Sequence, residues 1–130
     1  MEYTKPNFKN CIINVSATLA EYLGVKTDKT KIDELETVLT KGEYKNVVFI
    51  CFDGMGEHPL SVNLAPNSFL RSHVLKTITS TFPSTTTNAT TSMTTCAYPL
   101  EHGWFGWSLH FEEIGKNVDI FLAQDSQTGE

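Results

Sequence analysis

One uninterrupted apolar run constrains this chain more than any other feature of its sequence. Residues 47–52 are six consecutive apolar residues, VVFICF, rich in β-branched and aromatic types and without polar alternation. A run of this kind is typical of a strand buried on both faces at the centre of a largely parallel sheet. Asp53, Gly54 and Gly56 follow it, and glycines let the backbone turn sharply. We therefore expect a central strand that ends at an acidic residue.

The end of this strand is where a site is expected. Ligands of open α/β sheets collect outside the carboxyl ends of the strands, and Asp53 falls at that point. Asp53 is therefore a candidate metal ligand. The alternative is that it only makes a turn.

A second constraint is the segment 81–95, which is dense in hydroxyl groups and has no charged residue. It follows a second expected strand over 75–80, and Ser84 or Thr85 can cap a helix that continues to about Cys96. A threonine at the start of such a helix lies where backbone N–H groups and the helix dipole favour an anion. The alternative is that the threonines only cap the helix and cover its surface.

The remaining pattern predicts one domain with helices first and strands last. Periodic apolar positions and turn residues indicate helices over 12–23, 32–39 and 66–73 and a pair of strands over 104–111 and 118–123. The expected organisation is a helical lead-in over 1–44, core motifs over 45–107, a strand pair over 108–123 and a frayed end over 124–130.

Composition excludes several classes of partner. The formal net charge is −5 and no cluster of Lys and Arg exists to pair with phosphates, so no nucleic-acid surface is expected. No apolar stretch reaches the length of a membrane span, and no membrane partner is expected. The three cysteines are odd in number and far apart in the sequence, so they indicate neither a disulfide framework nor a CxxC metal site. This usage is typical of a reducing compartment, and we expect a cytoplasmic protein.

An acid at a strand end and a hydroxyl at a helix start together suggest one reaction. A threonine hydroxyl is a poor nucleophile near neutral pH, and a coordinated divalent ion lowers its pKa. The same ion neutralises charge on a transferred phosphoryl group. The pair therefore suggests a metal-activated alkoxide that attacks phosphorus.

Three motifs in this order carry a resemblance to a known family. Residues 47–56, 82–86 and 93–103 are similar to the amino-terminal third of the alkaline phosphatase superfamily, in its type I phosphodiesterase/nucleotide pyrophosphatase branch. The resemblance covers about residues 45–107. It implies an α/β three-layer sandwich with a central, largely parallel sheet flanked by helices. It also implies two divalent metal ions, usually zinc, and hydrolysis of a small phosphate-ester substrate through a phosphothreonine or phosphoserine intermediate.

The resemblance assigns roles to two residues. Asp53 matches the first metal-ligating aspartate of the family, and Thr86 matches the nucleophile, which also contacts the metal. Thr85 and Thr87 are adjacent candidates for the nucleophile. His102 belongs to a turn that is structural in the family.

Two departures from the family pattern shape the expectation. Trp107 stands where many nucleotide pyrophosphatases carry an asparagine, and no Asp-His pair follows Gly103. One aspartate and one threonine cannot build two closed metal sites. We therefore expect an inactive amino-terminal fragment of a metal-dependent phosphodiesterase, whose exposed sheet edges favour a homo-oligomer. The alternative is a noncatalytic module that binds phosphate or supports an assembly.

Overall fold

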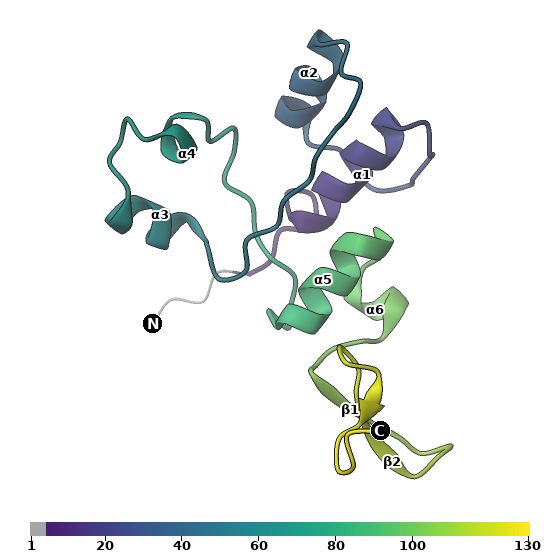
Figure 1. The fold of residues 1–130 in the computed structure, drawn as a ribbon. Coiled ribbons are helices and arrows are strands. Elements are labelled where there is room, and N and C mark those ends of the chain that lie inside the picture. Colours follow the sequence, from purple (N-terminus) through teal and green to yellow (C-terminus); the bar gives the residue numbers. More distant parts are fainter. Residues whose placement is uncertain (1–4) are drawn as a thin grey trace. The chain divides into compact units, whose positions relative to one another are not determined.

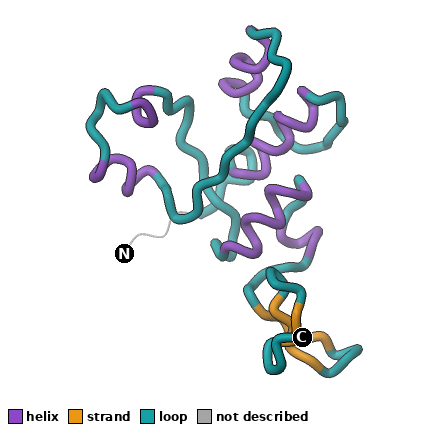
Figure 2. Tube along the Cα trace, in the orientation of Figure 1, coloured by secondary structure: helices purple, strands orange, loops and turns teal. Residues whose placement is uncertain are grey.

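The computed structural model describes residues 5–130, which form two compact units. The first unit takes in the chain up to Ile32 together with Ile78–Glu130, and the second unit is Asp33–Thr77. Figure 1 labels the six helices of the described residues and the strands β1 and β2. Figure 2 shows that helices and loops make up most of the described chain, with strands confined to its last part.

Three helices shape the first unit: α1 (Ile12–Tyr22), α5 (Thr86–Thr95) and α6 (Pro99–His102). Helix α1 packs against α5, and α5 packs against α6. The helix expected over 12–23 is confirmed, and Gly24 follows it with a φ of 86°, a left-handed conformation that suits glycine. Helix α6 was expected only as a turn.

Buried polar side chains hold the beginning of α1. The Asn14 side chain accepts a hydrogen bond from the Cys11 N–H (2.7 Å) and donates one to the Thr30 carbonyl (2.8 Å). The Thr18 hydroxyl accepts a bond from the Ile32 N–H (2.9 Å). Asn14 and Thr18 are fully buried, so these bonds replace the water that their backbone partners would otherwise bind. They tie the returning loop to the helix.

The threonine-rich helix α5 confirms the helix predicted from the sequence. Its N-cap is Thr85 and its C-cap is Cys96, which has a left-handed φ of 56°. Threonine is a weak helix former, but the hydroxyls inside this helix donate to carbonyls one turn earlier. These bonds run from Thr90 to Thr86 (2.7 Å), from Thr94 to Thr90 (2.9 Å) and from Thr95 to Thr91 (2.7 Å).

A small antiparallel sheet ends the described chain. Strand β1 (Ser108–Phe111) pairs with β2 (Lys116–Asp119), and β2 pairs with β3 (Gln124–Asp125) in the order β1-β2-β3. The register places Ser108 opposite Asp119 and Val118 opposite Asp125. The predicted strand pair is therefore confirmed, but the first strand begins at Ser108 instead of 104, and the second covers Lys116–Asp119 instead of 118–123.

The expectation of a frayed end over 124–130 is wrong at its first residues. Besides β3, the Ser126 N–H donates to the Asn117 carbonyl (2.9 Å). The Asp125 carboxylate pairs with Lys116 at 2.9 Å, and this contact is the main reason why the pKa of Asp125 falls to about 2. These contacts hold a polar segment whose composition gave no sign of them.

The second unit contains α2 (Asp33–Lys41), α3 (Glu57–Asn63) and α4 (Phe69–Ser72). Helix α2 was predicted, and its acidic first turn and Lys41 in its last turn complement the helix dipole. Helix α3 was not predicted, and α4 is shorter than the expected helix over 66–73. The Arg71 guanidinium donates to the carbonyls of Leu64 (2.7 Å) and Ser61 (3.2 Å), which joins α4 to the end of α3.

The predicted fold class, a three-layer sandwich with a central, largely parallel sheet, is wrong for the described chain. Residues 46–52 form no strand, and their apolar side chains are exposed, Val48 at 79% and Ile50 at 65%. The strand expected over 75–80 is reduced to one parallel bridge between Cys11 and Thr79. The described residues form six helices and a three-stranded antiparallel sheet. The composition of 46–52 favours a strand, but a strand also needs a neighbour that satisfies its backbone groups.

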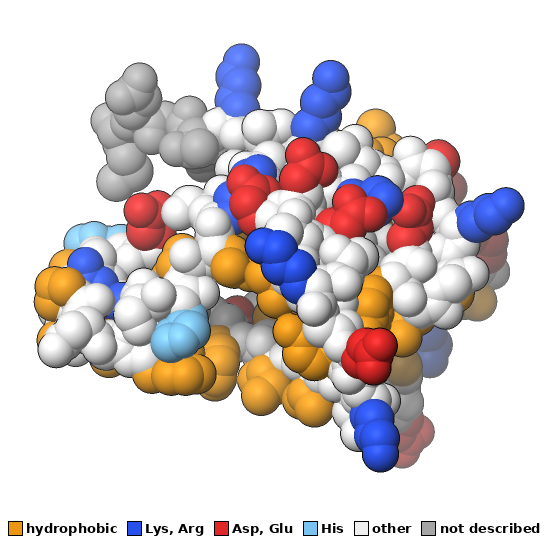
Figure 3. Space-filling view, turned by 90° about the horizontal axis from the view of Figure 1, so that it is seen from above, with side chains coloured by type: hydrophobic (Ala, Val, Ile, Leu, Met, Phe, Trp, Pro, Cys, Tyr) orange, Lys and Arg blue, Asp and Glu red, His pale blue; other side chains and the backbone are white. Residues whose placement is uncertain are grey.

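Apolar side chains are common on the surface of the described residues. Figure 3 shows hydrophobic side chains, in orange, lying open between charged ones. Large exposed apolar patches mark interaction surfaces.

No helix within residues 5–130 combines the length and the apolar character that crossing a membrane requires.

The Asn14 contacts predict the effect of one substitution. Asn14→Ala removes the partners of the Cys11 N–H and the Thr30 carbonyl, and an unsatisfied buried group costs about 1–3 kcal/mol. We expect the free energy of unfolding of the variant to fall by about 2–4 kcal/mol in urea titrations. The control is Thr94→Ala, which removes an exposed hydroxyl bonded only within α5 and should change stability by less than about 0.5 kcal/mol. Equal stabilities of the two variants would contradict the role of Asn14.

Candidate functional site

The loop before α5 is fixed by the side chain of Asn88. Its amide nitrogen donates to the Pro83 carbonyl (2.6 Å), and its backbone N–H donates to the Thr85 hydroxyl (3.4 Å). The Phe82–Pro83 peptide bond is cis. Asn88 is fully buried, and its two partners are partly exposed. Asn88 was not among the residues predicted for the site, although an amide three positions after a threonine N-cap is a signal that could have identified it.

The structure gives the three neighbouring threonines different environments. Thr85 is the N-cap, and its hydroxyl also contacts the Phe105 carbonyl (3.5 Å). Thr87 is buried, with 1% of its surface exposed. Thr86 is the first residue of α5 and is half-buried. Because successive helical residues point about 100° apart, the three hydroxyls face different directions.

Three buried side-chain oxygens in and just before this helix lack a hydrogen-bond partner among the described residues. They belong to Thr81, Thr87 and Asn88. Most buried polar atoms in folded proteins are paired, and each exception needs an explanation such as strain or a functional role. The beginning of α5 is therefore the strongest candidate for a site in the first unit.

Asp53 lies in a turn of the second unit and is exposed. Gly54 follows it with a φ of 67°, so the sharp turn predicted at this glycine is confirmed. Thr86 belongs to the first unit, and a shared site of Asp53 and Thr86 therefore stays a prediction.

The described residues do not fit a two-metal centre. Within residues 5–130, no three side chains of His, Cys, Asp or Glu are grouped so that they could hold a metal ion. Structural and catalytic zinc sites take at least three protein ligands. No chemical step through a metal ion follows from these residues.

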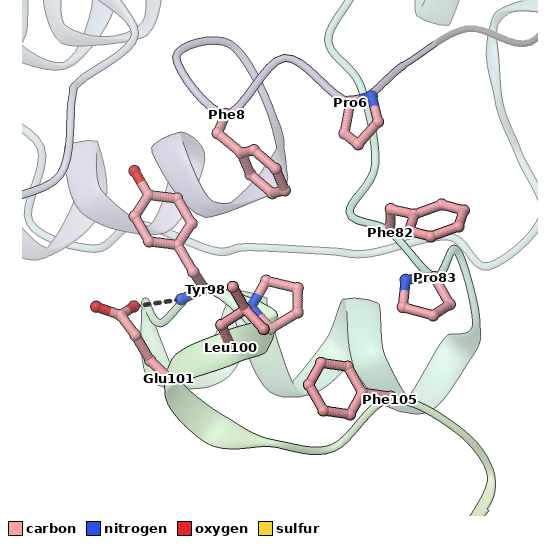
Figure 4. A pocket seen from close by; sticks show the side chains of 9 residues that line it. Pro6, Phe8, Phe82, Pro83, Tyr98, Leu100, Glu101 and Phe105 are labelled. Atoms are coloured by element: carbon pink, nitrogen blue, oxygen red, sulfur yellow. Dashed lines mark hydrogen bonds between the residues drawn. The ribbon is translucent and has the colours of Figure 1, made fainter.

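An apolar pocket of about 690 Å³ lies beside the start of α5. Figure 4 shows its lining, in which the rings of Phe8, Phe82, Tyr98 and Phe105 surround the space together with prolines and Leu100. Phe8 meets Tyr98 edge to face, with ring centroids 5.4 Å apart. The pocket shares Phe82 and Pro83 with the loop that leads to Thr86, so an apolar group bound there would lie next to that loop.

One charged residue of the pocket lining is already paired. The Glu101 carboxylate accepts hydrogen bonds from the Lys29 ammonium (2.7 Å) and the Tyr98 N–H (2.5 Å). The Lys29 contact is the main reason why the pKa of Glu101 is lowered, and Glu101 in turn raises the pKa of Lys29. Lys29 also lies 4.5 Å from the centre of the Tyr98 ring, within the range of a cation–π contact. Glu101 therefore holds the start of α6.

His102 connects α6 to α5. Its Nδ1 accepts a hydrogen bond from the Trp104 N–H (3.0 Å), and its Nε2 lies 2.9 Å from the hydroxyl of the buried Ser92. Because Nδ1 accepts, the proton of the neutral ring is on Nε2, which donates to Ser92. Burial lowers the pKa of His102 and so favours this neutral form.

Trp107 packs within the last part of the chain. Its ring stacks on Phe121 with centroids 5.3 Å apart. Its carbonyl accepts a hydrogen bond from the Ile120 N–H (2.9 Å). These contacts give Trp107 a packing role beside the small sheet.

The His102 contacts predict a dependence of stability on pH. The folded pKa lies below the unfolded value of 6.5, so the unfolded chain binds more protons between these two values. We expect stability to be full above about pH 6.5 and to fall as the pH drops toward the folded pKa. An NMR titration should give a pKa below 6.5 and the Nε2–H tautomer. Urea titrations should show a smaller pH dependence in His102→Ala, and an equal dependence in both proteins would contradict this assignment.

Comparison with known proteins gives no match of any kind. No family model, no curated protein and no solved structure matches the chain.

Proposed function

We propose that this chain supplies the nucleophile of a phosphate-ester hydrolase, with Thr86 as the residue that accepts the phosphoryl group. The observation that carries the proposal is the position of Thr86 as the first, half-buried residue of α5. The first N–H groups of a helix have no partner inside the helix and, with the helix dipole, favour a phosphate. The hydroxyl and the anion-binding end of α5 thus belong to the same turn.

The proposed reaction has two steps, transfer of the phosphoryl group to Thr86 and hydrolysis of the phosphothreonine. The Thr86 oxygen attacks phosphorus, a P–O bond to Thr86 forms, and the P–O bond to the alcohol of the ester breaks. The proton of the hydroxyl is lost, and the alcohol leaves after gaining one. Water then cleaves the phosphothreonine, which returns the hydroxyl and releases the phosphate product.

The neighbours of Thr86 support its assignment over the adjacent threonines. Thr85 is engaged as the N-cap, and Thr87 is buried within the unit. The buried Asn88 side chain keeps the loop in place by its bond to Pro83. The substrate is a small phosphate ester, and the proposal includes no nucleic acid and no membrane.

Activation of Thr86 is proposed to require groups outside the described residues. Residues 5–130 offer no grouped set of metal ligands. We propose that the full-length protein holds two divalent metal ions, zinc by the family resemblance, with Asp53 as one ligand. The free thiols of Cys11, Cys51 and Cys96 support the cytoplasm as its compartment, because reduced cysteines are typical there.

The first test is the location of the covalent phosphate. Full-length protein is incubated with p-nitrophenyl phosphate and zinc, quenched in acid and analysed by mass spectrometry. We expect phosphate on Thr86, retained in Thr86→Ser and absent in Thr86→Ala. Thr85→Ala, the matched control, should still form the phosphoenzyme while losing about 1 kcal/mol of stability with its cap. Phosphate on Thr85 or Thr87 would reject the assignment, and phosphate binding without any phosphoenzyme would favour the noncatalytic module.

The second test concerns Asp53 in the full-length protein. Asp53→Asn replaces an anionic oxygen ligand by a neutral amide, so we expect a lower zinc content and at least about tenfold lower activity. The side chain is exposed, and the fold should be unchanged by circular dichroism. The control is Cys51→Ala, which alters an exposed thiol two residues earlier and should keep the zinc content. Unchanged zinc and activity in Asp53→Asn would make Asp53 a turn residue only.

A further inference from the structure

The apolar pocket beside the start of α5 has a lining that matches an uncharged ligand. Four aromatic rings, three prolines and Leu100 contribute to it, and all of them belong to the first unit. Figure 4 shows the rings of Phe8, Tyr98 and Phe105 lying around one space. The volume of about 690 Å³ falls within the range of pockets that hold drug-sized ligands, about 300–1,000 Å³. The pocket therefore has room for a ring together with a short chain.

The charged groups beside the pocket are already paired with one another. The Lys29 ammonium lies 2.7 Å from the Glu101 carboxylate and 3.1 Å from that of Asp28. It also lies 4.5 Å from the centre of the Tyr98 ring, so a cationic ligand group at this ring would meet a like charge. Figure 4 shows the Glu101 carboxylate at the margin of the pocket, bonded to the Tyr98 N–H. The described lining thus offers an ionised ligand group no unpaired opposite charge, whereas an apolar group needs none.

Two contacts join the wall of the pocket to the first turn of α5. The Asn88 amide donates to the Pro83 carbonyl (2.6 Å). The Thr85 hydroxyl contacts the Phe105 carbonyl (3.5 Å). Pro83 precedes Thr86 by three residues, which limits the separation of their Cα atoms to about 11 Å. A ligand whose phosphate meets the start of α5 can therefore extend into the pocket with the rest of its length.

We propose that this pocket holds the alcohol part of the phosphate ester and selects an uncharged, apolar alcohol. This substrate class rests on the proposed role of Thr86 as the nucleophile and applies to the same site. The two ends of such a substrate match two neighbouring surfaces. The first N–H groups of α5 favour the phosphate, and the aromatic rings remove the hydrocarbon part from water.

The same lining discriminates against polar alcohols. A sugar or an amine that enters the pocket gives up its hydrogen bonds to water. The phenylalanine rings, the prolines and Leu100 have no polar side-chain atom that could replace these bonds. Selectivity therefore comes from the polar groups that a wrong substrate would leave unpaired, as well as from the apolar contacts of the right one.

Turnover of matched esters by the full-length protein with zinc tests the substrate class. The esters are 4-phenylbutyl, 4-aminobutyl and ethyl phosphate, all monoesters of primary alcohols that differ in the group offered to the pocket. We expect kcat/KM to be at least about tenfold higher for the phenylbutyl ester than for the ethyl ester, and no higher for the aminobutyl ester. Equal values for the phenylbutyl and ethyl esters, with phosphothreonine formed, would overturn the substrate class alone. The absence of phosphothreonine with every ester would overturn the proposed function on which it rests.

Calorimetric titration of full-length Thr86→Ala tests the pocket without any reaction. This variant lacks the proposed nucleophile, so the esters stay intact during the measurement. We expect the Kd of 4-phenylbutyl phosphate to be at least about tenfold lower than that of ethyl phosphate. Equal affinities would overturn the assignment of the pocket to the alcohol part.

Two further substitutions in the Thr86→Ala background locate the binding preference, and a third is the matched control. Leu100→Asp adds a charge to the lining and Phe82→Ala removes a ring, at side chains that are 89% and 59% exposed, so circular dichroism should report an unchanged fold. We expect the preference in Kd to fall below about threefold in both. The control is Leu23→Asp, at a residue that is 71% exposed after α1 and outside the lining, and it should keep the preference. An unchanged preference in both pocket variants, or an equal loss in Leu23→Asp, would overturn the proposal.

Discussion

The buried side chain of Asn14 is the contact on which the first unit depends. One amide satisfies a backbone donor at the start of α1 and a backbone acceptor in the loop that returns toward Ile32. Helix α1 packs against α5, where the Ser16 hydroxyl donates to the Met93 carbonyl (2.5 Å). The candidate threonines stand at the beginning of that second helix. The hydrogen bonds of Asn14 and Ser16 thus help to position the candidate site, together with the packing of α1 against α5.

The helices could be predicted where the signal was local. Periodic apolar residues and Gly24 identified α1, a periodic apolar stripe over 32–39 identified α2, and the threonine N-cap identified α5. Helix α3 lies in a stretch with a proline and few apolar residues, and its sequence gave no periodic pattern. Residues 47–52 show the opposite failure. Their strong strand composition predicts a central strand, but pairing depends on residues distant in sequence, which a local pattern does not reveal.

In the candidate site too, the features set by neighbouring residues could be predicted and those set by distant residues could not. The position of Thr86 in the first turn of α5 and the sharp turn after Asp53 follow from capping and glycine rules, which act within a few residues. The bond of Asn88 to Pro83 and the contacts of His102 with Ser92 and Trp104 depend on how loops return to helices. Such returns are set by packing, and composition alone does not encode them.

The mixture of buried residues has a consequence for the thermodynamics of unfolding. Among the described residues that are almost fully buried, polar side chains such as Asn14, Thr18, Asn88 and Ser92 are as prominent as apolar ones, while many large apolar side chains are already in water. Exposure of apolar surface raises the heat capacity on unfolding and exposure of polar surface lowers it, for a usual net of about 12–15 cal/mol/K per residue. The isolated chain should therefore have a smaller heat-capacity change than is usual. Its stability curve would be flat, so that cooling and warming over a wide interval change its free energy of unfolding little.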